Sequence, residues 1–190
     1  MRLQISATSL LALALSTLCA IHAQQGSAAK NGAPSAEQNA AGAQQPARAK
    51  DTMLLLASGN HAPVSISLAD FRAMTHVTIT VHNAHADADE TYSGVPLAAL
   101  LAKLDAPLGE HLRGKALASY IVASGSDGYS VVLSIAEADP SFHGGDILVA
   151  DTRDGQPLGT SGPFQLIVSE DKRPARWVHN LVSISLQDAH

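Results

Sequence analysis

The fold is decided by residues 147–168, which read ILVADTRDGQPLGTSGPFQLIV. Two apolar runs in this stretch, residues 147–150 and 164–168, have the composition of buried β-strands. Between them, Asp154 and Gly155 form a typical turn pair. The stretch therefore predicts strands that fold back on one another around a tight turn.

The flanking sequence predicts further strands and several short helices. Ser67 with Asp70, and Ser134 with Glu137, have the three-residue spacing of helix caps. Pro96 is placed to begin a helix, because proline is favoured at the first helical position. That helix would bury one face, made of Leu97, Leu100, Leu101 and Leu104. Strands are expected at residues 52–57, 64–68, 76–81, 120–123, 129–133 and 181–186, and a polar loop at residues 82–91. We therefore expect an α+β fold, a mixed sheet with short helices.

The chain divides into three segments by composition. Residues 1–23 combine Arg2, an apolar run and a small-residue exit, which is the pattern of a cleavable secretory signal peptide. Residues 24–50 contain no Val, Ile, Leu, Met or aromatic residue and predict a disordered linker. Residues 51–190 are the right length for a single domain. We expect a periplasmic or secreted protein without a membrane span.

Charge and cysteine content exclude several classes of function. The 190 residues carry 12 Lys+Arg and 17 Asp+Glu, a net charge of −5, which argues against general nucleic-acid binding. The chain has one cysteine, Cys19, inside the expected signal peptide. A disulfide framework or a cysteine-based zinc site within the chain is therefore excluded.

A group of imidazole and carboxylate side chains is a candidate metal site. His82, His85, Asp87 and Asp89 lie within eight residues, and such donors bind zinc or copper. The spacing is loose, and the alternative is an exposed loop without a metal.

A basic cluster near the C-terminus is a candidate anion site. Lys172, Arg173 and Arg176 lie within five residues, beside Trp177. Guanidinium groups bind phosphate and other anions through paired hydrogen bonds. The alternative is a solvated turn that places Trp177 in the core.

Asp127 is a third candidate, since a carboxylate before Gly128 and Tyr129 could lie beside a substrate. Asp-Gly is first of all a turn pair, however, and the structural interpretation is favoured.

Six pieces of the sequence, taken in order, resemble the molybdopterin-binding domain of the sulfite oxidase family. They are residues 92–97, 126–129, 147–150, 154–158, 162–168 and 176–178, and the likeness extends over about residues 76–186. The resemblance implies a sulfite-oxidase-type fold, a molybdenum-pterin cofactor with a cysteine thiolate on the metal, and oxygen-atom transfer or a related reduction.

The sequence departs from that family at the metal ligand. Val81 stands at about the position of the cysteine, in the strand that continues through His82 and Asn83. Valine cannot ligate molybdenum, and His82 could replace the thiolate only if the register shifts by one residue. Arg176 matches a basic residue near the pterin phosphate, so the resemblance implies cofactor contacts at His82, Asn83, Lys172, Arg173 and Arg176.

These observations favour an exported protein that keeps the fold without the redox centre. The signal segment lacks the twin arginines that accompany export of a folded, cofactor-loaded protein. We expect a ligand- or partner-binding module without bound molybdenum, whose partner is a small anionic ligand or a periplasmic protein. A molybdopterin-dependent oxidoreductase and a zinc- or copper-binding protein using His82 and His85 are the alternatives. The oligomeric state is left open.

Overall fold

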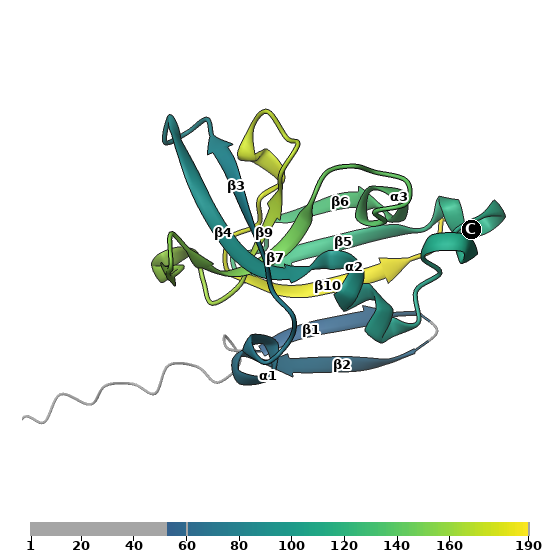
Figure 1. Cartoon of the computed structure of the whole chain (residues 1–190). Coiled ribbons are helices and arrows are strands. Elements are labelled where there is room, and N and C mark those ends of the chain that lie inside the picture. The colour runs from purple at the N-terminus through teal and green to yellow at the C-terminus, as the bar shows by residue number, and fades with distance from the viewer. Residues whose placement is uncertain (1–52, 60, 190) are drawn as a thin grey trace, which may run out of the picture. The chain divides into compact units, whose positions relative to one another are not determined.

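The computed structural model describes residues 53–59 and 61–189 of the chain, and the expected signal peptide and linker lie outside them. The described residues form two sheets with three short helices, which confirms the predicted α+β class (Figure 1). Within these residues no helix is both long and apolar enough to cross a membrane.

The first sheet is mixed. Its strand order is β2-β1-β10-β5-β6, and only the pair β1 and β10 is parallel. The strands expected at residues 52–57 and 64–68 are confirmed as β1 and β2, which pair antiparallel. The members are β1 (Met53–Ser58), β2 (His61–Ser67), β5 (Tyr120–Gly125), β6 (Ser130–Ser134) and β10 (Leu181–Gln187).

The second sheet is antiparallel and is built around β7. On one side β7 pairs with β4, which pairs with β3; on its other side it pairs with β8 and β9. The strands are β3 (Val77–Asn83), β4 (Ala88–Pro96), β7 (Ile147–Arg153), β8 (Gln156–Pro157) and β9 (Gln165–Val168). Residues 147–168 therefore supply the centre and one side of this sheet.

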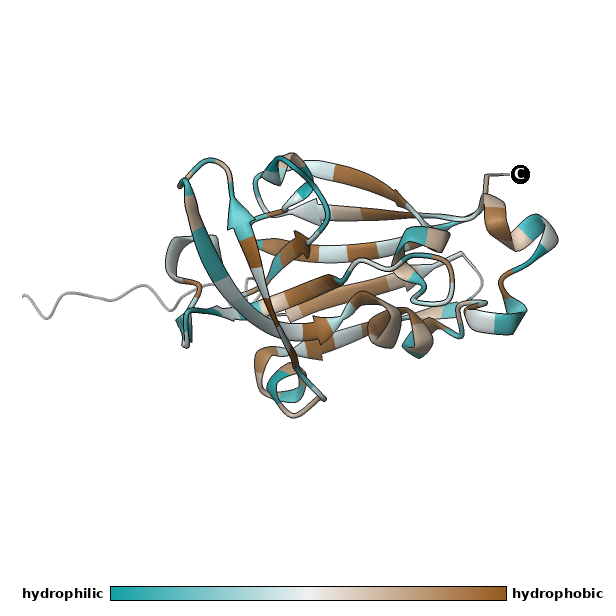
Figure 2. Ribbon diagram, turned by 45° about the horizontal axis from the view of Figure 1, so that its top comes forward, coloured by the Kyte–Doolittle hydropathy of each residue, from teal (hydrophilic) through white to brown (hydrophobic). Residues whose placement is uncertain are grey.

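The helices begin at the predicted caps. In α1 (Leu68–Arg72) the Ser67 side chain accepts a hydrogen bond from the Asp70 backbone N–H. In α3 (Ile135–Ala138) Ser134 and Glu137 form a complete capping box. The apolar face expected after Pro96 is also buried, because α2 (Leu97–Leu101) and the 3-10 turn Ala102–Leu104 place all four leucines in the core. Figure 2 shows the apolar segments along the strands in the middle of the domain and hydrophilic ones at the hairpin and loop ends.

The predicted polar loop at residues 82–91 is wrong. β3 continues to Asn83 and β4 begins at Ala88, so a short turn joins two paired strands. His82 and Asp89 face each other across this ladder. Alternation explains the difference: Glu90 and Tyr92 are buried while the residues on either side of each are more exposed, as in a strand with one interior face.

The pairing of β4 with β7 is irregular at one point. Ser93 lies opposite Thr152, but Gly94 lies opposite Ala150, so Asp151 is an extra residue on β7. Such a β-bulge reverses the alternation of the side chains that follow it. Gly94 lies against the backbone of Val149 and Ala150, and a Cβ atom at this position would collide with both.

This close approach generates a first prediction. Gly94→Ala should lower the free energy of unfolding by about 3 kcal/mol, because backbone atoms cannot move aside as a flexible side chain can. The measurement is urea unfolding followed by far-UV circular dichroism. Gly59→Ala is the matched control, since a Cβ atom there meets nothing within 4 Å. Equal stability of the two variants would contradict the close packing of β4 on β7.

Candidate functional site

A cavity of about 420 Å³ opens where the two sheets meet the segment that connects β9 to β10. The β3–β4 hairpin and this connecting segment rise on the same side of the domain (Figure 1). The turn between β5 and β6 contributes the remaining wall. The residues that line the cavity come from six stretches of the chain and are Asn83, His85, Tyr92, Asp127, Tyr129, Arg153, Gln165, Pro174, Ala175, Trp177 and His179.

The β-bulge at Asp151 brings the polar groups of the second sheet to one face. Ala150 lies directly opposite Gln165, and Arg153 lies opposite Tyr92. In a regular strand Ala150 and Arg153, three residues apart, would face opposite sides. With Asp151 bulged out, Arg153, Tyr92 and Gln165 all reach the cavity, while the Asp151 carboxylate turns to α1 and accepts a hydrogen bond from Arg72 Nε at 3.2 Å.

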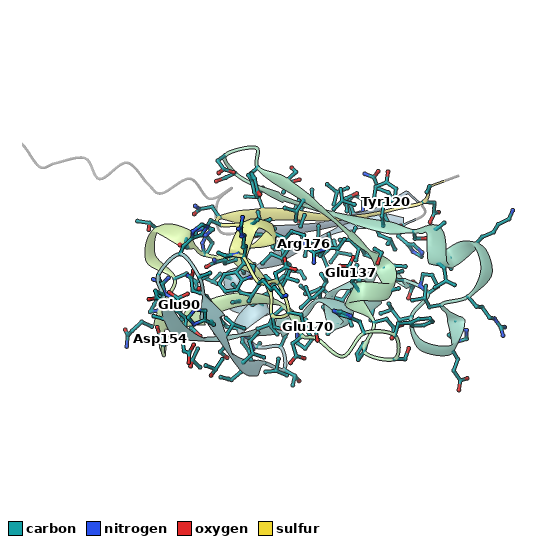
Figure 3. The ribbon with its side chains drawn as sticks, turned by 90° about the horizontal axis from the view of Figure 1, so that it is seen from above. Glu90, Tyr120, Glu137, Asp154, Glu170 and Arg176 are labelled. Atoms are coloured by element: carbon teal, nitrogen blue, oxygen red, sulfur yellow. The ribbon has the colours of Figure 1, made fainter. Side chains whose placement is uncertain are left out.

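A buried carboxylate organises one wall. Glu90 Oε2 accepts hydrogen bonds from Tyr92 Oη at 2.7 Å and from Asn83 Nδ2 at 2.8 Å. Glu90 Oε1 accepts from Arg153 Nη1 at 3.3 Å. Figure 3 shows Glu90 near Asp154, at one end of the domain. Three donors therefore hold the Glu90 carboxylate, and they fix Tyr92, Asn83 and Arg153 in place.

Tyr92 is held in its neutral form. Burial, followed by the hydrogen bond to Glu90, raises the pKa of Tyr92 to about 12. The phenol therefore remains a hydrogen-bond donor to Glu90 throughout the physiological pH range.

Gln165 is a buried amide in the lining of the cavity. Its side chain is 1% exposed, and Nε2 lies 3.3 Å from His179 Nε2. His179 Nδ1 in turn lies 2.9 Å from Ser161 Oγ. Gln165 Oε1 has no hydrogen-bond partner, and among the described residues it is the one buried side-chain polar atom in that condition. An acceptor at the wall of a cavity is thus left for a molecule that enters it.

Aromatic residues form the other wall. Trp177 Nε1 donates to the Val168 carbonyl at 3.0 Å, and the Trp177 ring meets Tyr92 edge-on with centroids 5.7 Å apart. Tyr129 Oη donates to the Ala175 carbonyl, which ties the β5–β6 turn to the segment before Trp177. These bonds fix the ring positions and leave half of Tyr129 exposed.

Of the predicted cofactor contacts, the structure places Asn83 at the cavity and His82 away from it. Val81 and Asn83 lie on the inner face of β3, and His82 lies on the exposed face. His82 Nδ1 is 3.0 Å from Asp89 Oδ1, and His82 Nε2 is 3.8 Å from Asp87 Oδ1. His85, from the same predicted metal group, lines the cavity instead. Across the described residues, no three His, Cys, Asp or Glu side chains form a group that could hold a metal ion.

The basic cluster does not form a single patch. Arg176 donates from Nε and Nη2 to both oxygens of Asp171, at 2.9 and 2.6 Å, and from Nη1 to Glu137 Oε1 at 2.8 Å. Figure 3 shows Glu137 beside Arg176. Lys172 and Arg173 are exposed and lie outside the cavity lining. The guanidinium of Arg176 is therefore engaged by two carboxylates of its own domain.

Sequence reasoning missed most of the site. Glu90 lies inside the expected loop and Tyr92 directly after it, so the alternation of β4 was not recognised. Arg153 lies beyond the expected strand 147–150, and the bulge decides that its side chain faces the cavity. Gln165 did leave a signal, because it is the one polar residue in the apolar run 164–168. A buried strand that carries an amide often uses it for a specific hydrogen bond.

Comparison with known proteins gives a fold relationship alone. No family model matches the chain, and no curated protein is significantly similar to it. Solved structures do match, among them the sulfane dehydrogenase SoxCD from Paracoccus pantotrophus, at 16% sequence identity and a TM-score of 0.56. The match covers 73% of this chain and 39% of that chain. The chain therefore shares the fold of part of that enzyme and corresponds to less than half of its length.

The Tyr92 environment generates a second prediction. The protein has three tyrosines, and alkaline titration at 295 nm should show one phenolate forming near pH 12 that is absent in Tyr92→Phe. Because the folded-state pKa of Tyr92 lies above its ordinary value of 10.0, its contribution to stability is complete below pH 10 and is lost as pH rises through about 12. Tyr120→Phe is the control and should keep the late step. Circular dichroism at each pH reports whether the fold persists, and a late step that survives in Tyr92→Phe would refute the assignment.

The Arg176 contacts generate a third prediction. Arg176→Ala should lower the free energy of unfolding by about 2 kcal/mol, because it removes charge-assisted hydrogen bonds to two carboxylates. Burial opposes ionisation of Glu137, but hydrogen bonds from Arg176 and Ser134 outweigh it and lower the pKa of Glu137 below its ordinary 4.5. The difference between Arg176→Ala and the parent should therefore shrink as pH falls below 4.5.

Urea unfolding at pH 7 and at acid pH measures this difference. Arg173→Ala, at an exposed neighbour, should change the stability by less than about 0.5 kcal/mol. Equal stability of the two variants at pH 7 would mean that the hydrogen bonds of Arg176 to Asp171 and Glu137 do not stabilise the fold.

Proposed function

We propose that this chain is an exported small-molecule-binding module that keeps a sulfite-oxidase-type fold without its redox centre. The observation that carries the proposal is Gln165 Oε1, a buried acceptor without a partner at the wall of the cavity. The signal-peptide pattern of residues 1–23 supports export.

An unpaired buried acceptor destabilises the protein that contains it. Leaving such a group without a hydrogen bond costs about 1–3 kcal/mol. A hydrophobic side chain at position 165 would avoid this cost in a strand whose neighbours, Leu166 and Ile167, are apolar. A ligand that donates a hydrogen bond to Oε1 recovers the energy, and this gives the amide a role in recognition.

The remaining geometry of the cavity suits a small organic ligand. Its volume of about 420 Å³ falls within the range of ligand sites, and aromatic rings and fixed polar groups share the lining. Hydrogen bonds within the protein already fix Tyr92, Tyr129 and Trp177. Binding therefore requires little further ordering of these side chains.

The side chains present do not fit a molybdenum cofactor. The resemblance requires a thiolate, and it implies Val81 at about that position; the Val81 side chain is buried on the inner face of β3. His82, the suggested replacement, lies on the opposite face, and the one cysteine of the chain, Cys19, lies outside the described residues. Arg176, suggested for the pterin phosphate, already binds Asp171 and Glu137. A molybdopterin-dependent oxidoreductase is therefore the weaker alternative.

Composition of the purified protein tests this proposal. We expect protein isolated from the periplasm of a molybdenum-replete host to lack stoichiometric molybdenum and pterin fluorescence. Native mass spectrometry should instead find a bound small molecule, which Gln165→Leu loses and Gln156→Leu, at an exposed position, retains. Stoichiometric molybdenum with pterin would overturn the proposal in favour of the oxidoreductase.

Stability of the ligand-free protein gives a further prediction. Gln165→Leu removes the unpaired Oε1 and loses one 3.3 Å contact to the exposed His179. The free energy of unfolding of this variant should therefore be between 0 and about 2 kcal/mol higher than that of the parent. Thermal unfolding after dialysis against denaturant and refolding measures this difference. A loss of more than about 1 kcal/mol would mean that the amide serves the fold and not a ligand.

A further inference from the structure

We infer, building on the proposed function, that the ligand of this cavity is a small organic cation that presents N–H donors, such as an amidinium, guanidinium or ammonium group on an apolar body. Three features of the lining support this class: the use of its donors, the acceptors left free, and its charge.

Four side chains of the lining already donate hydrogen bonds within the protein. Asn83 Nδ2 and Tyr92 Oη donate to Glu90, Trp177 Nε1 to the Val168 carbonyl, and Tyr129 Oη to the Ala175 carbonyl. The Gln165 amide nitrogen faces His179. A ligand rich in acceptors, such as a phosphate or a carboxylate, would therefore depend on the His85 ring and on the N–H groups of Arg153 that do not face Glu90.

Two acceptors of the lining, in contrast, remain available to a ligand. Gln165 Oε1 has no partner. Asp127 Oδ1 accepts from the Tyr129 backbone N–H at 2.9 Å, and no basic side chain of the described residues forms a salt bridge with this exposed carboxylate. An N–H group that enters the cavity thus meets one deep amide oxygen and one carboxylate at the rim.

The charges favour a cation. Arg153 is the one lysine or arginine of the lining, and its guanidinium is paired with Glu90. Asp127 adds a negative charge that no cation offsets. Tyr129 is half-exposed and follows Asp127 by two residues, and aromatic rings attract cations. Counted with its partner Glu90, Arg153 is offset, so Asp127, Glu90 and Arg153 together carry a formal charge of −1 with the histidines neutral, in a chain of net charge −5.

Three nearly isosteric probes separate charge from shape. Benzamidinium is a cation with N–H donors, benzamide is neutral with fewer donors, and benzoate is an anion without donors. Trp177 is the one tryptophan of the chain and lines the cavity, so its fluorescence reports binding at this site. We expect the Trp177 signal to give affinities in the order benzamidinium, benzamide, benzoate, with at least a tenfold difference between the first and the last.

Two variants locate the contacts. Asp127→Asn keeps an oxygen for the Tyr129 N–H but removes the charge, and should weaken benzamidinium binding about fivefold without changing benzamide binding. Gln165→Leu should weaken both. Asp105→Asn, an exposed residue outside the cavity, is the control and should bind all three probes like the parent.

Failure of this inference can be distinguished from failure of the proposed function. Benzoate binding as tightly as benzamidinium, or benzamide matching benzamidinium, would overturn the cationic class and leave a ligand-binding cavity. If none of the probes changes the Trp177 signal at millimolar concentration, the cationic class is likewise overturned. The co-purified molecule seen by native mass spectrometry then decides the proposed function separately.

Discussion

The contact between β4 and β7 at Gly94 is the constraint on which the rest of the domain depends. Only a residue without a side chain lets the two backbones approach this closely, and the β-bulge at Asp151 begins where they do. The bulge divides the polar residues of β7 between two faces. Asp151 turns to Arg72 on α1 and stabilises the packing there, while Arg153 joins Glu90 at the cavity. A single irregularity in one ladder thus directs a structural carboxylate and a site residue, two positions apart in sequence, to different partners.

Local patterns in the sequence predicted most of the secondary structure. The caps at Ser67 and Ser134, the leucine face after Pro96 and the strands on both sides of Asp154-Gly155 depend on residues within one or two turns of each other. The prediction failed at residues 82–91, where histidines and aspartates occupy the exposed face of a hairpin. Their polarity resembles that of a loop, and only the buried positions of Glu90 and Tyr92 reveal the strand.

The site could not be predicted in the same way, because its contacts join distant parts of the chain. Arg153 reaches Glu90 across 63 positions, and Gln165 depends on a segment 14 residues later for its one partner. The basic cluster illustrates the opposite error. Lys172, Arg173 and Arg176 are neighbours in sequence, but Arg176 turns inward to Glu137, 39 positions away, and to Asp171. Their closeness in sequence suggested one shared anion site, but Lys172 and Arg173 are exposed while Arg176 pairs with carboxylates of its own domain.

The parallel pair β1 and β10 has a consequence for the order in which the domain folds. β1 can form its hairpin with β2 as soon as both have been synthesised, but its other neighbour, β10, is the last strand of the domain. β10 also joins β1 to β5, so the first sheet consists of two separate hairpins until residues 181–187 arrive. Contacts between such distant segments form slowly, because the long intervening chain must first be ordered. In a chain synthesised from its N-terminus, the first sheet therefore stays open until residues 181–187 are available to pair with β1 and β5.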